Sequence, residues 1–285
     1  MKKRVVSLLM ALMLLMSLLP TGAMAAGGDW TYDASAGTLT QGDIVLNVTE
    51  NAEDKTKLTV TGYQNIGSGA IDLTGTITDA EDGSYTVTAI GESAFESCAG
   101  LKSIVLPDGL TGINYKAFYN CTGLQSIHIP ESVTFIGASA FRYCSSITSI
   151  VIPSGITTLN QDLFSGCDSL SLIVLPEGLK EIKSSAIGSC SGLKELTLPA
   201  SVTSISNTAF SYSGNLSTLT LLSATPVSNL ASVLDRVKDS ISSIRVPDSS
   251  VAAYKQVLAG SSYADKVQGI GSGAMLSVNP ASHLP

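Results

Sequence analysis

The cysteines are the most regularly placed reactive side chains of this 285-residue chain. There are five, each 23 residues after the one before: Cys98, Cys121, Cys144, Cys167 and Cys190. Thiols form disulfides in exported proteins, ligate metals, or fill a core as small apolar groups. A metal needs ligands from several directions, whereas side chains repeating at one step of a stacked chain run parallel. We therefore interpret the column as buried free thiols. Pairing stays open, because stacked coils bring neighbouring Cα atoms to about 5 Å, which a disulfide permits.

Other groups able to do acid–base or metal chemistry are few. His128 lies between two isoleucines in an alternating segment that points it to solvent, and His283 lies near the C-terminus. One candidate base does not assemble a Ser–His–Asp or Cys–His set. The acidic segment 79–83 lacks the ligand spacing of a calcium loop and predicts a hairpin turn. The sequence thus predicts a protein that is not an enzyme and holds no metal or cofactor.

Residues 1–25 predict a secretory signal peptide. A basic start at 2–4 precedes an apolar run at 5–20, and the small residues at 23–25 fit a cleavage site. The run is too short to favour a membrane span, although a retained anchor is an alternative. Removing this segment leaves 13 basic against 23 acidic side chains, a net charge of −10. That charge disfavours nucleic acid and anionic membrane as partners.

The cysteine spacing belongs to a repeat of 23 residues, V-x-x-I-G-x-x-A-F-x-x-C-x-x-L-x-x-I-x-L-P. Its aromatic column is Phe95, Phe118, Phe141, Phe164, Ile187 and Phe210, and its proline column is Pro107, Pro130, Pro153, Pro176 and Pro199. About eight positions per unit are apolar, more than one unit can bury by itself. The repeat therefore predicts stacked coils that share one continuous core.

Each part of the unit predicts a local structure. In L-x-x-I-x-L, Ile104 and Leu106 alternate with Val105, which predicts a strand that the following proline ends. The segment V-x-x-I predicts a second short strand. It is followed by a glycine or asparagine that suits a corner with positive φ: Gly91, Asn114, Gly137 and Asn160. The spacing of A-F-x-x-C predicts one inward-facing helical turn.

This signature resembles BspA-type leucine-rich repeat proteins over residues 87–247, with six full units and a degenerate last one. The resemblance implies a repeat solenoid: a right-handed, curved leucine-rich repeat superhelix, β-rich, with parallel strands on its concave face and short helical turns. It also implies export by bacteria, often those of animal mucosa, and a role in adhesion. The sequence departs from the pattern at Ile187, at Ser213 in place of cysteine, and at 223–240, where we expect an irregular or helical insertion.

The flanks predict caps. Residues 26–86 hold short alternating segments at 37–40, 43–48, 57–60 and 84–87, which predict a β-rich N-terminal cap. Family members carry a similar lead-in with a Thr-Gly-Tyr element, here Thr61-Gly62-Tyr63. Residues 248–270 predict a C-terminal cap, with a helix from Ser249 to Leu258 capped by Asp248, and residues 271–285 predict a flexible tail.

The outward strand positions are the candidate binding site. They are Val105, His128, Val151, Val174, Thr197 and Thr220, followed by Arg245 and with Leu172 nearby. Valines facing water on a concave sheet favour contact with a protein or glycan, although β-branched residues also favour strands for their own sake. We expect a secreted or cell-surface adhesion protein that binds a host macromolecule, such as one of the extracellular matrix. The alternative is a structural or glycan-binding component of the bacterial envelope.

Overall fold

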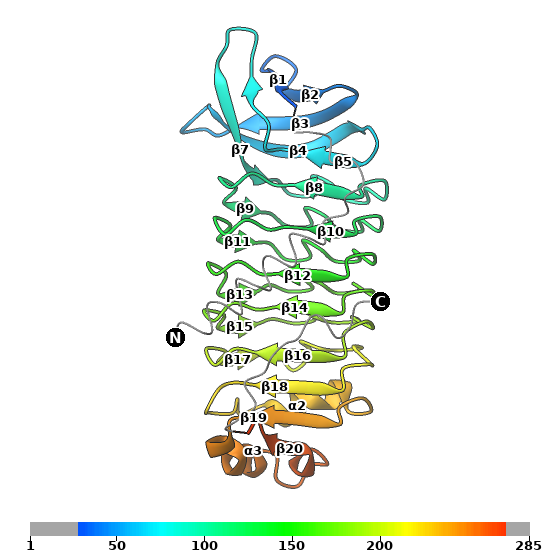
Figure 1. Ribbon diagram of the computed structural model, residues 1–285, viewed down its shortest axis with the longest axis vertical. Coiled ribbons are helices and arrows are strands. Elements are labelled where there is room, and N and C mark those ends of the chain that lie inside the picture. The colour runs from blue at the N-terminus through cyan, green and yellow to red at the C-terminus, as the bar shows by residue number, and fades with distance from the viewer. Residues whose placement is uncertain (1–27, 272–285) are drawn as a thin grey trace.

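The computed structural model describes residues 28–271 as an elongated stack of coils (Figure 1). Strands of the N-terminal part close one end, and the last helix and strand lie at the other. The expected signal peptide and residues 272–285 of the expected tail lie outside the described residues. The fold is thus a strand-rich repeat, with further strands before it and a helix and strand after it.

Each coil of the repeat contributes two short strands, one to each of two series. The first series is β8 (Ser103–Val105), β10 (Ser126–Ile127), β12 (Ser149–Val151), β14 (Leu172–Val174), β16 (Glu195–Leu198) and β18 (Thr218–Leu221). The second is β9 (Gly112–Ile113), β11 (Phe135–Ile136), β13 (Thr158–Leu159), β15 (Glu181–Ile182) and β17 (Ser204–Ile205). Paired strands within each series are parallel and join residues 23 positions apart, as Ile104 pairs with Ile127.

The first strand of the unit forms as its alternation predicts. Ile104 and Leu106 are buried, and Val105 between them is half-buried. The carbonyl of Pro107 then accepts the amide of Leu110 at 2.9 Å, and the other four prolines of the column make the same turn. Because proline has no amide hydrogen to donate to a ladder, the strand ends before it and the chain turns toward the second series.

The aromatic column forms a continuous stack through the core. The ring centroids of Phe118 and Phe141 lie 5.4 Å apart, and those of Phe141 and Phe164 lie 5.7 Å apart, with nearly parallel planes. Tyr63 from the N-terminal part stacks on Phe95 at 6.0 Å. The Thr-Gly-Tyr element therefore starts the aromatic stack that the repeats continue.

The A-F-x-x-C segment is a turn and not a helix, so this prediction was wrong. Alternate amides leave the coil: Phe118 donates to the carbonyl of Ala140 in the next coil, whereas Ala117 donates back to Asn114. In an α-helix the amides bond to carbonyls four residues earlier, whereas Ala117 bonds to a carbonyl three residues earlier and Phe118 to another coil. The positive φ angles lie at two other positions of the turn, for example Lys116 and Asn120 at 55° and 57°.

The corner residues do not adopt positive φ either, which corrects a second expectation. A Cβ added to Gly137 would lie 2.4 Å from the backbone nitrogen of Tyr115. Glycine is needed there because two backbones approach closely. At the same corner one coil later, Asn160 donates its side-chain amide to the carbonyl of Ile136 at 2.7 Å.

The N-terminal part contains antiparallel pairs, so the chain is not a parallel solenoid throughout. Its strands are β1 (Trp30–Asp33), β2 (Thr38–Gln41), β3 (Ile44–Glu50), β4 (Lys57–Ile66), β5 (Ala70–Asp72), β6 (Ile77–Thr78) and β7 (Ser84–Ile90). Strand β6 pairs with both β1 and β7, which closes a ring of six strands. The acidic segment 79–83 is the hairpin turn between β6 and β7, as predicted.

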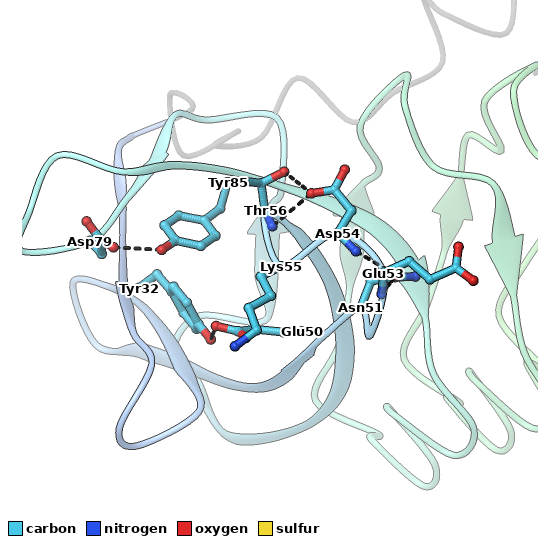
Figure 2. Close-up of polar contacts among 9 residues, drawn as sticks. All are labelled: Tyr32, Glu50, Asn51, Glu53, Asp54, Lys55, Thr56, Asp79 and Tyr85. Carbon is cyan, nitrogen blue, oxygen red and sulfur yellow. Dashed lines mark hydrogen bonds and ion pairs between the residues drawn. The ribbon is translucent and has the colours of Figure 1, made fainter.

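The six-strand ring carries a cluster of polar contacts, drawn in Figure 2. The rings of Tyr32 and Tyr85 meet edge to face at 4.6 Å. The Tyr32 hydroxyl donates to Glu50 at 3.0 Å, and the Tyr85 hydroxyl donates to Asp79 at 2.7 Å. Burial and the Glu50 carboxylate raise the pKa of Tyr32 to about 12. The six-strand ring joins the repeats through β7, which pairs in parallel with β9. Strand β5, which lies outside the ring, pairs in parallel with β8.

The segment 223–240, where we expected an insertion, follows the 23-residue spacing of the repeat for its first part. Asn229 donates to the carbonyl of Ile205, as Asn160 does to Ile136, and buried Val233 lies 23 residues after Phe210. Thr218 of β18 pairs with Ser243, 25 residues later, so this coil holds two residues more than the others. They fall in the helical segment that replaces the turn, α2 (Leu230–Leu234) and η1 (Asp235–Val237). The insertion is therefore confined to one turn.

The C-terminal part continues the first strand series. It comprises β19 (Ser243–Val246), η2 (Asp248–Ser250), α3 (Val251–Val257), η3 (Ala264–Lys266) and β20 (Val267–Gly269). Ile244 pairs with Val267, again 23 residues apart, so this segment is one more coil with α3 in its turn. Asp248 does not cap the helix as expected, because its carboxylate instead accepts the amide of Gly271 at 2.9 Å.

Candidate functional site

The cysteine column is part of the core and not a reactive site. All five thiols are free and buried. Cys144 donates to the carbonyl of Phe118 at 3.1 Å, and three other cysteines repeat this bond to the residue 26 positions earlier. Ser213, which replaces cysteine, donates to Ile187 at 2.8 Å in the same way. Burial raises the pKa of Cys190 to about 12, which keeps the thiol neutral and unreactive.

The metal-ligating side chains, the histidines and a small cavity were the other places where chemistry could occur in the described part of the chain. Residues 28–271 hold no cluster of three or more His, Cys, Asp or Glu side chains able to bind a metal. His128 is exposed, as predicted, but it lies just after β10 and not on the strand, and His283 lies outside the described residues. A cavity lined by Leu198, Leu221 and Tyr254, among others, has a volume of about 10 Å³, which is room for one water.

The outward column of the first strand series is the candidate contact surface, which we call the strand face. Val151 pairs in register with Val174, and Val105 pairs with Asp72 of β5. His128 directly follows β10, at the position that Val105 holds on β8. Side chains pointing outward from paired parallel strands lie about 5 Å apart. Val151 and Val174 are therefore direct neighbours in this column.

The residues of this row differ in exposure. Val105, Val151 and Val174 are half-buried, and His128 and Thr197 are exposed. Thr220 is only 3% exposed, so the expectation that it faces water was wrong. It pairs with Thr197 on one side and with Arg245 on the other, and a short side chain between two paired strands loses its exposure to its neighbours.

Leu172 belongs to a second outward column, two residues before the first. It pairs with Ser149, and the same position holds Ser103, Ser126 and Glu195 in other coils. Leu172 is half-buried, like the valines, and lies on the same strand as Val174. The strand face therefore combines three apolar side chains on β12 and β14 with hydroxyls and an imidazole around them. Such a surface can contact a macromolecule but offers no groups arranged for catalysis.

Residues 83–233 match the sequence family described as the BspA type leucine rich repeat region, in six copies. The chain belongs to the BspA-type leucine-rich repeat family. Two solved structures resemble it. One is a leucine rich repeat protein of T. pallidum, with 29% identity, a TM-score of 0.56, and coverage of 63% of this chain and 80% of that one.

The other structure is a leucine rich cell surface protein of Faecalibacterium prausnitzii A2-165. It has 24% identity and a TM-score of 0.51, and the match covers 75% of this chain and 71% of that one. At this identity the likeness shows the fold alone. No curated protein matches this BspA-type chain. Within residues 28–271, none of the helices combines the length and the apolar character needed to cross a bilayer.

Proposed function

We propose that this protein is a secreted or surface-attached adhesion module that binds a host protein and catalyses no reaction. Its repeats form a right-handed, curved superhelix, and the strand face is the contact surface. The residues that make the contact are Val105, His128, Val151, Leu172, Val174 and Thr197. Because Thr220 is buried, it takes no part.

The apolar row of β12 and β14 is the observation that carries the proposal. Val151, Leu172 and Val174 lie on two paired strands and keep part of their surface open to solvent. The core side of the same strands is already filled, since Ile150 and Ile173 are buried. The outward valines therefore add little to the core, and their arrangement in adjacent register suits an apolar contact at the centre of an interface.

Binding of the chain from residue 26 to 285 to an array of host matrix proteins, glycans and purified bacterial wall material tests this function. We expect saturable binding to at least one matrix protein. Because the six contact residues include no Asp, Glu, Lys or Arg, we expect this binding to change little with added salt. Attachment to wall material without any matrix protein would favour the envelope alternative, and a turnover activity lost on changing His128 would contradict the non-enzymatic role.

A further inference from the structure

A second surface lies at the turns between the two strand series, away from the strand face. Its residues come from two adjacent coils, and we call them the turn patch: Tyr115, Lys116, Tyr119, Arg142 and Tyr143. Tyr115 and Tyr143 are 43% and 38% exposed, although each carries a large ring. None of these residues belongs to the repeat signature or to the strand face.

The aromatic rings of the patch form one connected cluster with its two cations. The Lys116 ammonium lies 5.4 Å from the ring centre of Tyr115 and 5.0 Å from that of Tyr119. The rings of Tyr119 and Tyr143 meet edge to face at 5.5 Å. The Arg142 guanidinium lies 4.8 Å from the Tyr143 ring centre and donates to its hydroxyl at 3.0 Å. These contacts hold the rings in fixed positions at the surface.

The charges of the patch are compensated within it. Lys116 pairs with Glu96 at 3.5 Å, and Arg142 pairs with Asp162 at 3.3 Å. Neither cation is therefore left over to attract an acidic partner. The exposed rings and the paired charges together favour an uncharged ligand.

The backbone at Tyr143 is unusual for a residue with a large ring. Its φ is +62°, a conformation that a bulky side chain rarely adopts. Other coils place smaller residues at this position with similar φ, namely Ser97, Asn120, Gly166 and Ser189. Tyr212 repeats the arrangement three coils later with φ +65°, and it is 84% exposed. A large ring held at a strained position while 38% of Tyr143 stays exposed points to a function at the surface.

The residues around the tyrosine rings indicate whether the partner of the turn patch is a protein or a glycan. A protein interface centres on a desolvated apolar core, with aromatic anchors packed among aliphatic groups. In the turn columns around Tyr143 the neighbouring coils instead carry hydroxyl, amide and carboxylate groups, such as Asn120, Gln161 and Asp162. Flat rings among hydrogen-bonding groups suit a sugar, which presents an apolar C–H face bordered by hydroxyls. We infer that the turn patch binds a neutral polysaccharide, with pyranose rings stacked on Tyr119 and Tyr143.

Native gel electrophoresis in gels that contain hydroxyethylcellulose, galactomannan or glycogen tests this inference. The binding variant is Tyr119→Ser with Tyr143→Asn, because Ser165 and Asn120 are the residues that other coils use at these positions. The matched control is Phe135→Thr, which removes an aromatic ring that is 50% exposed and copies Thr158 of the next coil. Thermal melting of all three proteins accompanies the gels.

We expect at least one polymer to retard the native chain, equally at low and high salt. The double variant should bind at least tenfold more weakly while melting no lower than the native chain, and Phe135→Thr should bind normally. Absence of retardation in all three gels would overturn the inference, as would normal binding by the double variant. A fall in melting temperature parallel to the lost binding would make the rings structural. Loss of binding to a matrix protein alone would make the patch a protein contact. The strand face and its proposed function are independent of each of these results.

Discussion

Replacing Phe141 by alanine removes the central ring of the aromatic stack. Its side chain is fully buried, between Phe118 at 5.4 Å and Phe164 at 5.7 Å. Truncating a buried phenylalanine lowers the free energy of unfolding by about 3–5 kcal/mol through lost burial and the cavity left behind. Two aromatic contacts, each about 0.5–1.5 kcal/mol, vanish with it. We therefore expect a loss near 5 kcal/mol, at the upper end of that range.

Urea denaturation followed by circular dichroism measures this loss directly. Phe135→Ala is the control, since it deletes the same side chain at a site that is 50% exposed. An exposed substitution away from special features changes stability by about 0.5 kcal/mol or less. Losses of similar size in the two variants, or a loss below about 1 kcal/mol for Phe141→Ala, would refute the stacked core.

Three further predictions concern the thiol column. Cys144→Ser should lower the free energy of unfolding by about 1 kcal/mol or less, because a hydroxyl makes the bond of Ser213 at the same position; a loss of several kcal/mol in urea titration would contradict this. A thiol reagent should label few sites in the native chain and all five after denaturation without reductant, whereas recovery of one or three thiols would establish disulfides. Burial raises the pKa of Cys98 and Cys167, and that of Cys190 to about 12. The stability that these neutral thiols contribute is therefore complete below the unfolded pKa near 8.5 and is lost as the pH rises toward 12. Urea midpoints that do not fall between pH 8 and 11 would contradict this pH dependence.

The core could be predicted from sequence because it depends on spacing alone. A constant step of 23 places the four phenylalanines from Phe95 to Phe164 one above another, and the stack at 5.4–5.7 Å follows. The turn could not be predicted in the same way. Apolar residues at A-F-x-x-C fit both a helical turn and a stacked turn, and the choice is made by bonds between coils, such as that from Phe118 to Ala140.

For the candidate site, the sequence predicted which positions of each strand point outward, but not how exposed their side chains are. Alternation along each strand tells which side chains point outward, as for Val151 and Val174, but not how deeply their neighbours cover them. Thr220 shows the difference, since its burial depends on the strands on both sides. The continued phase at Asn229 was available in the sequence, because it lies three steps of 23 after Asn160; the missing proline and cysteine hid it.

The most direct test of the strand face uses two double variants that each add two negative charges. For each variant we measure the dissociation constant of its complex with the matrix protein that binds in the array. Val151→Glu with Val174→Glu places two carboxylates on adjacent coils of the strand face. Thr134→Glu with Thr157→Glu places the same charges on adjacent coils at exposed positions beside the second series. An unpaired charge is costly to bury, so the valine pair should weaken binding at least a hundredfold, and the threonine pair less than threefold, with both variants folded. Equal dissociation constants for the two variants would contradict binding through the strand face.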